Sequence, residues 1–319
     1  MGARTVRHIV GAGIGMAAAP AVAFLLLDGI RSTTFLAHVM MSNHPSGLTG
    51  GLTEGGGIRL ASEWLAGVEL LAAGALAGVL AGARRISPVA PLVAGLQFLA
   101  ADFYAHSSGS AMLGIMLHGP ASLVMEIQDA AFSRVFLLLG GALAVAALAP
   151  WRWRTSEPTS QWANWHAAGV IAGMAAVPVL WFMLQLSESA ATGGGPPGII
   201  TSANEFLLFM VAGALVMGVL AAARWVSPVA AVIAGAPLLA VGLFTLAAPS
   251  PAQSIIDYLV YGQDWQPATE SLAASGWLVL FGGMVLAAGA ASGRWRREPR
   301  PVPVRPTPAA EPALEQGAA

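Results

Sequence analysis

The chain has 319 residues, of which 56% are hydrophobic and only 10% are charged. Soluble domains carry about 25% charged residues, so this chain has too little polar surface to cover a water-soluble globule. It contains no cysteine, which excludes disulfides, thiolate metal sites and cysteine nucleophiles. The composition therefore predicts an integral membrane protein.

The first predicted element is an uncharged apolar run from Ile9 to Leu27, preceded by Arg4 and Arg7. This run of 19 residues is long enough to cross a hydrocarbon core of about 30 Å. A cleaved signal peptide has a similar charge pattern, but the segment after His8 returns in the middle of the chain after His166. Because a repeated element is retained structure, we expect a membrane helix here.

Seven further apolar runs of about 20 residues follow, each bounded by polar or turn-rich segments. Together with the first run they predict an all-α integral membrane protein with eight transmembrane helices. The expected spans are Ile9 to Leu27, Ser62 to Ala83, Pro88 to Ala105, Ala131 to Leu148, His166 to Leu186, Glu205 to Ala223, Pro228 to Ala248 and Leu272 to Ala291.

Two sequence patterns recur in the same order along the chain. GVLAGARRISPVA, which begins at Gly78, returns as GVLAAARWVSPVA, which begins at Gly218. The Gly-Gly pair that begins at Gly140 returns at Gly282, with nearly the same offset. Because each copy holds an even number of spans, both copies keep the same orientation, which predicts two tandem, parallel four-helix repeats. The expected units are residues 1–154 and 155–296 for the repeats and residues 297–319 for a disordered, Pro-rich cytoplasmic tail.

The arginines predict the orientation of the chain. All fifteen basic residues are arginines, and twelve of them fall on one face of the predicted bundle. Positive residues are retained on the cytoplasmic side, so both termini are expected in the cytoplasm and the chain in the cytoplasmic membrane, as a multi-pass protein. The three arginines at the outer face are Arg31, Arg59 and Arg134.

Matched glycines and prolines occur in the first span of each repeat. Glycines four residues apart permit close helix contact, and a proline inside a helix removes a hydrogen bond. In some transporters, broken helices at matched positions line the substrate site, whereas ordinary packing kinks are the alternative interpretation. The residues are Gly11, Gly15 and Pro20 in the first repeat and Gly169, Gly173 and Pro178 in the second.

Glu69 is placed inside the second span, where an ionisable side chain is expensive and is a functional candidate for that reason. Its match in the second repeat is Phe209, so a function of this carboxyl group would belong to the first repeat alone. A structural ion pair with Arg59 or Arg134 at the outer surface is the alternative.

Asp102 and His106 stand four residues apart at the outer end of the third span and should share a helix face. With histidines of the outer loops they could bind a divalent metal or act as acid and base on an extracytoplasmic substrate. Solvated side chains facing the headgroups are the alternative, because no metal or nucleophile motif accompanies them. The catalytic candidates are Glu69, Asp102 and His106, and the metal-binding candidates are His38, His44, His106 and His118.

No phosphate loop, dinucleotide fingerprint or nucleic-acid module occurs in the sequence, so no cofactor is identifiable and no nucleic-acid partner is expected. The expected partners are the lipid bilayer and, for an accessory subunit, another membrane protein. We predict a non-enzymatic function, either as an accessory subunit or as a transporter-like helix bundle with its path at the repeat interface. A membrane enzyme with an extracytoplasmic site around Asp102 and His106 is the alternative.

Overall fold

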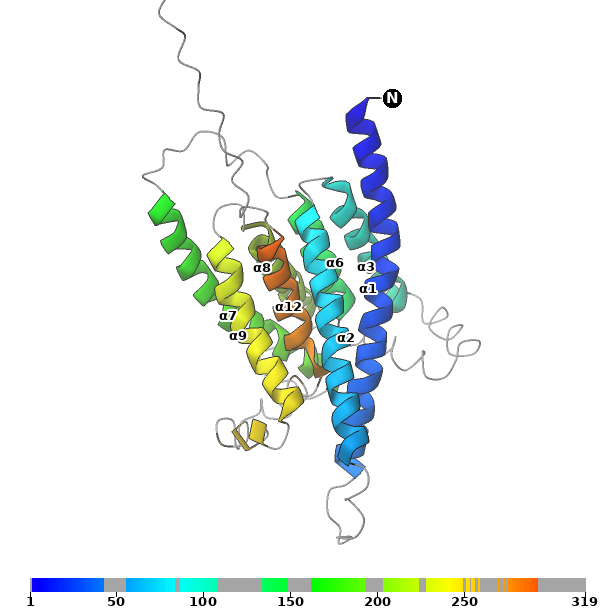
Figure 1. Ribbon diagram of the computed structural model, residues 1–319, viewed down its shortest axis with the longest axis vertical. Coiled ribbons are helices and arrows are strands. Elements are labelled where there is room, and N and C mark those ends of the chain that lie inside the picture. Colours follow the sequence, from blue (N-terminus) through cyan, green and yellow to red (C-terminus); the bar gives the residue numbers. More distant parts are fainter. Residues whose placement is uncertain are drawn as a thin grey trace, which may run out of the picture.

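In the computed structural model, every regular element of the described residues is an α-helix. The structure describes residues 2–42, 56–83, 87–107, 134–148, 162–192, 203–223, 228–248 and 275–291, together with residues 251, 252, 254, 255, 258, 269 and 272. The helices are α1 (Ala3–Ser42), α2 (Gly56–Ala83), α3 (Val89–Ser107), α6 (Val135–Leu148), α7 (Trp162–Thr192), α8 (Ala203–Ala223), α9 (Pro228–Ala247) and α12 (Trp277–Ala290) (Figure 1).

Within the described residues, four helices are long and apolar enough to cross a membrane. Their apolar stretches are Arg4–Thr33, Trp64–Ala83, His166–Leu186 and Val229–Ala247. Shorter apolar stretches form α6, α12 and most of α8. The described part of the chain is thus an all-α bundle with helices of transmembrane character, which agrees with the prediction from composition.

The first helix is much longer than the span predicted for it. The expected outer loop after Leu27 is instead part of α1, which continues without a break to Ser42. Between Pro20 and Pro45 the chain contains no proline and a single glycine, so no residue in this stretch strongly favours an earlier end. The residues after the expected end of the first span therefore continue the same helix, and its apolar stretch extends to Thr33.

The helices α6 and α12 are shorter than predicted. Each contains 14 residues, which corresponds to about 21 Å, less than the roughly 30 Å of a hydrocarbon core. The residue before each helix has a left-handed backbone, with φ of 55° at Arg134 and 74° at Gly276. Because this conformation is incompatible with a right-handed helix, both helices begin after it. Arg134 and Gly276 are separated by the same offset as the two Gly-Gly pairs.

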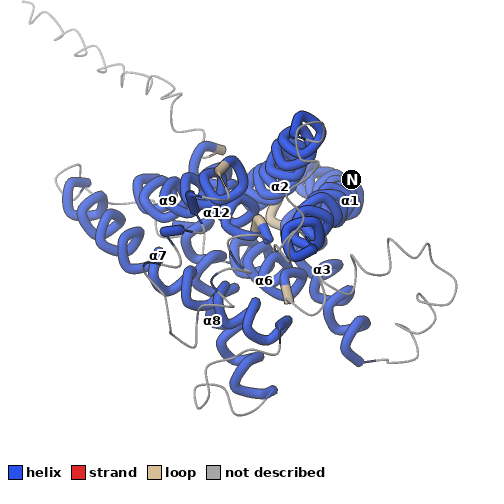
Figure 2. Tube along the Cα trace, turned by 90° about the horizontal axis from the view of Figure 1, so that it is seen from below, coloured by secondary structure: helices blue, strands red, loops and turns tan. Residues whose placement is uncertain are grey.

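Two sets of four helices have the same neighbours in the bundle (Figure 2). In one set α1 contacts α2 and α3, and α3 contacts α6; in the other α7 contacts α8 and α9, and α9 contacts α12. Between the sets, α6 packs on α8 and α12 packs on α2. The main contacts are therefore unchanged when each helix is exchanged for the helix at the same place in the other set, whereas the smaller contact of α2 with α9 has no counterpart of similar size between α8 and α3.

Glycines bring the helix backbones together at matched crossings. A Cβ atom added at Gly95 of α3 would lie 2.7 Å from the carbonyl oxygen of Gly140 in α6. A Cβ atom added at Gly235 of α9 would lie 2.9 Å from the carbonyl oxygen of Gly282 in α12. Carbon atoms do not approach backbone oxygens this closely, so only glycine fits at these crossings without moving a helix.

The glycine motif of the first span also lies at a helix contact in both sets. A Cβ atom at Gly15 of α1 would lie 2.5 Å from the carbonyl oxygen of Ala90, and one at Gly173 of α7 would lie 2.8 Å from that of Ala230. Ala90 and Ala230 occupy the same place in the repeated SPVA pattern. The same residues of the repeated sequence thus make the same contacts.

The prolines of α1 and α7 face away from these contacts. Pro20 and Pro178 are exposed and lie inside continuous helices. Gly11 and Gly169, on the same helices, are buried. This arrangement favours a packing function for the matched Gly and Pro residues over a broken helix that lines a substrate path.

Candidate functional site

The best-defined polar site lies where α3 ends and α6 begins. Asp102 is only 3% exposed, and the guanidinium group of Arg134 donates a hydrogen bond of 2.8 Å to its Oδ2 atom. The second carboxylate oxygen, Oδ1, is buried and has no hydrogen-bond partner among the described residues. Asp102 and Arg134 therefore form a charge-assisted ion pair in a largely apolar environment, where an unpaired charge would be costly.

The N-terminus of α6 adds a second favourable interaction for the Asp102 carboxylate. The first N–H groups of a helix have no partner within the helix, and the helix dipole is positive at that end. The backbone N–H of Leu137, in the first turn of α6, is close enough to the carboxylate to act on it electrostatically. The start of α6 thus offers the carboxylate a favourable environment in addition to the hydrogen bond from Arg134.

Arg134 has a backbone conformation that residues with a Cβ atom avoid. Its φ of 55° makes it the single non-glycine residue with a left-handed backbone in the described part of the chain. This conformation costs an L-residue about 1 kcal/mol. The ion pair with Asp102 offsets the strain, so the two residues stabilise the start of α6 together.

Glycines occupy the matching positions in the second set of helices. Gly242 of α9 corresponds to Asp102 when the two SPVA patterns are aligned. Gly276 corresponds to Arg134 when the two Gly-Gly pairs are aligned. A Cβ atom at Gly242 would lie 2.7 Å from the backbone nitrogen of Val279 in α12. At this place the backbones of α9 and α12 therefore pack directly against each other, whereas α3 and α6 are joined by the ion pair of Asp102 and Arg134.

His106 lies one turn after Asp102 on α3, as the four-residue spacing predicts. Its Nδ1 atom lies 2.7 Å from the backbone carbonyl oxygen of Asp102 and 3.7 Å from Oδ2 of the same residue. A neutral imidazole that donates from Nδ1 keeps Nε2 as an acceptor. Because the side chain is 27% exposed, Nε2 is the atom of this site that could take up a proton or a metal ion.

Glu69 belongs to a different contact, that of α1 with α2. Its carboxyl group is close enough to the side chains of Asp28 and Ser32 for an electrostatic effect, and its buried Oε2 atom has no hydrogen-bond partner in the described residues. The ion pair between Glu69 and Arg134 considered above is not formed, because Arg134 binds Asp102. The structure thus groups Glu69 with Asp28, and Asp102 with Arg134.

The remaining histidine candidates cannot be placed. His38 lies in α1 at a position whose side chain is not described, and His44 and His118 lie outside the described residues. Among the residues that are described, no three His, Cys, Asp or Glu side chains are grouped closely enough to hold a metal ion. The metal site around these histidines therefore stays a prediction.

Three residues of these sites were not predicted from the sequence. The sequence did contain a signal for Arg134, because Arg134 directly precedes the apolar segment with the first Gly-Gly pair, as Gly276 directly precedes the segment with the second pair. Asp28 and Ser32 gave no such signal, since the expected end of the first span at Leu27 placed them in a loop. Their interaction with Glu69 follows from the continuation of α1.

No protein-family model matches the chain, and no match was found among curated proteins or among solved structures. The described fold places the chain in a broad class, all-helical bundles in which four of the described helices are long and apolar enough to cross a membrane.

Proposed function

We propose that the protein is an eight-span integral protein of the cytoplasmic membrane, built as two tandem, parallel four-helix repeats with both termini in the cytoplasm. The repeat is supported by the equivalent glycine contacts at Gly95 and Gly235 and at Gly15 and Gly173. It is also supported by the exchange of partners between the halves, in which α6 packs on α8 and α12 packs on α2. Such reciprocal contacts are what a two-fold relation between the repeats produces.

The directions of the helices agree with parallel repeats. In Figure 1, α1 and α9 run from the top of the view to the bottom, and α2 and α12 run from the bottom to the top. Odd and even spans of the proposed repeats thus alternate in the same sense in both halves. The short helices α6 and α12 are mostly buried inside the bundle, where most of their residues face other helices instead of lipid.

For its activity, we propose a non-enzymatic, transporter-like bundle that binds protons or cations between α1 and α2. The observation that carries this proposal is the placement of Glu69 at the contact of α2 with α1, where its buried Oε2 atom has no hydrogen-bond partner among the described residues. Asp28 of α1 is the nearest carboxyl group that acts on it electrostatically, and two carboxylates close together repel each other, so the pair is stable when it shares a proton or binds a cation. Ionisable groups at such positions commonly mark ion pathways.

An accessory subunit is the second candidate, and the interface between the repeats favours it. Cβ atoms added at Gly74 or Gly78 of α2 would collide with backbone atoms of Leu280 and Met284 in α12. The two repeats are therefore interlocked by backbone contact at this place, where a transport path between them had been expected. A rigid scaffold for another membrane protein would need such an interface.

The enzyme alternative depends on His106 instead. Its Nε2 atom would act as the base or the metal ligand, and Asp102 would position the ring, because the Asp102 carboxylate is already bound by Arg134. Within the described residues, no three His, Cys, Asp or Glu side chains are grouped closely enough to hold a metal ion, so this candidate is third.

Replacing Glu69 by glutamine is expected to reduce ion flux by roughly tenfold or more, because a carboxamide cannot release a proton. The measurement is the decay of an imposed proton or sodium gradient in proteoliposomes that contain the full chain. Asp28→Asn should have the same effect, since the pair acts together, whereas the exposed Tyr258, 87% accessible, provides a control as Tyr258→Phe. If the wild-type chain produces no flux, or both variants retain it, the transporter function is excluded and the accessory function is favoured.

A further inference from the structure

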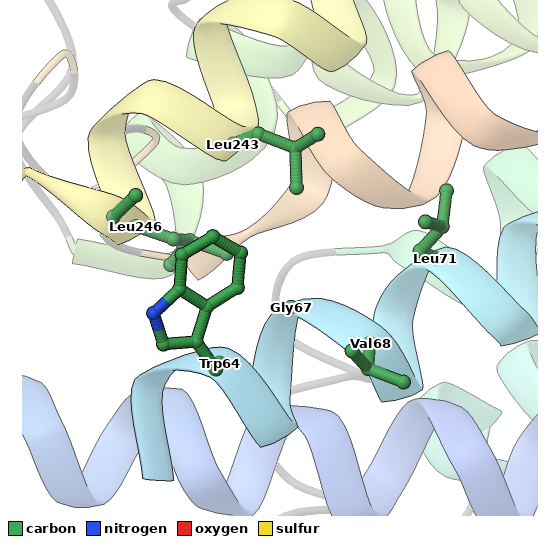
Figure 3. Close-up of a pocket in the computed structure, with 7 residues that line it drawn as sticks. Trp64, Gly67, Val68, Leu71, Leu243 and Leu246 are labelled. Carbon is green, nitrogen blue, oxygen red and sulfur yellow. The ribbon is translucent and has the colours of Figure 1, made fainter. Parts of the chain in front are cut away.

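An apolar cavity of about 170 Å³ lies between α2 of the first repeat and α9 of the second. Figure 3 shows the Trp64 ring standing opposite Leu243 and Leu246, with Gly67 at the side of α2 between Trp64 and Leu71. The indole nitrogen of Trp64 is the single polar side-chain atom among the described residues that line it. An apolar cavity of about 150 Å³ stays dry and accepts a molecule of the size of benzene.

The cavity is placed near one end of two membrane-spanning stretches. Trp64 is the first residue of the stretch Trp64–Ala83, and Leu246 is next to the last residue of the stretch Val229–Ala247. In the proposed orientation, both ends lie at the outer leaflet. Tryptophan is enriched at this level of a membrane, because its ring is apolar and its N–H can reach the headgroups.

We propose that this cavity binds an acyl chain of a membrane lipid, with the headgroup outside it beside Trp64. Hydrocarbon is the medium around both helices, water gains no hydrogen bond from the lining, and the volume matches a segment of a hydrocarbon chain. This site is independent of the carboxyl pair between α1 and α2. It depends only on the membrane location of α2 and α9.

Gly67 is the residue that keeps the cavity open. A Cβ atom added there would lie 3.5 Å from a methyl carbon of Leu246, which is ordinary contact, so alanine fits but a longer side chain would fill the space. The residue at the matching position of the second repeat is Leu207. The second repeat therefore has a bulky side chain at the matching position, and we expect a single lipid site of this kind on the described helices.

The proposal is tested by photo-crosslinking in liposomes with a phosphatidylcholine that carries a diazirine on one acyl chain. Mass spectrometry of the full chain should find adducts on Trp64, Leu243 and Leu246 more often than on Phe24 and Ile171, which are 68% and 69% exposed and face lipid. Gly67→Leu should reduce the adducts at the cavity to the level of Phe24, and Gly67→Ala should preserve them. Added unlabelled phospholipid should reduce the adducts at the cavity before it reduces those at Phe24 and Ile171.

Equal labelling of the cavity and of Phe24 would overturn the proposal, as would cavity adducts that persist in Gly67→Leu. Should Gly67→Leu fail to fold, Val68→Trp provides a second blocking variant, since Val68 also lines the cavity and is 57% exposed. Persistence of the cavity adducts in that variant would contradict the proposal equally.

Discussion

Replacing Arg134 by alanine is expected to destabilise the protein by about 3–5 kcal/mol, because removal of one partner leaves a buried charge without compensation. The remaining partner, Asp102, is 3% exposed, so water cannot replace the guanidinium group. Alanine also keeps the Cβ atom that strains the left-handed backbone at this position. The measurement is the free energy of unfolding of the purified chain in mixed micelles, followed by tryptophan fluorescence.

The helices α9 and α12 supply the control for this prediction. Gly242 and Gly276 occupy the positions that match Asp102 and Arg134 in the sequence, and the double variant Asp102→Gly with Arg134→Gly copies both glycines. It removes the buried charge and relieves the backbone strain together, so its loss of stability should be smaller than that of Arg134→Ala. If the effects of the two glycine substitutions simply add, the residues are not coupled and the interpretation of the pair is wrong.

Gly140→Leu is expected to have the second large effect, a loss of about 3 kcal/mol or more, because overpacking at a close crossing forces whole helices apart. The new Cβ atom would lie 2.7 Å from the carbonyl oxygen of Gly95 and 2.9 Å from the backbone nitrogen of Leu99. Neither atom belongs to a side chain that could move away. Reduced melting temperature and aggregation in size-exclusion chromatography are the expected observations.

Variants of two other glycines provide a negative and a positive control for this experiment. Gly13→Leu should be tolerated, because a Cβ atom at Gly13 meets no atom within 4 Å and leucine favours helices over glycine by up to about 1 kcal/mol. Gly282→Leu should destabilise as strongly as Gly140→Leu, since it occupies the matching crossing. Equal stability of the Gly13 and Gly140 variants would contradict the close packing of α3 and α6.

The order and type of the helices could be predicted from the sequence, because apolar length and repeated patterns determine them directly. Each of the eight described helices overlaps one predicted span. The ends were less predictable. The continuation of α1 depends on the absence of a strong stop after Leu27, and the late start of α12 depends on the left-handed backbone of Gly276. Neither feature changes the apolar character from which the spans were read.

The partners of the polar residues were the least predictable part. The spacing of Asp102 and His106 correctly placed them on one helix face, because four residues make about one turn. Contacts between helices do not follow from spacing, so the pairing of Asp102 with Arg134 required the structure. The same holds for Glu69, whose neighbour Asp28 lies on a helix that had been expected to end before it.

Thiol labelling at the two Ser-Pro turns tests the parallel, eight-span arrangement most directly. The chain has no natural cysteine, so Pro88→Cys, just before α3, and Pro228→Cys, at the start of α9, can be labelled singly with an impermeant maleimide. Tyr258→Cys provides the outer control, because Tyr258 is 87% exposed and lies between α9 and α12. We predict that Tyr258→Cys reacts in intact cells and that Pro88→Cys and Pro228→Cys both react only after permeabilisation. Reaction of one proline variant but not the other in intact cells would place the two turns on opposite faces of the membrane and would contradict the account.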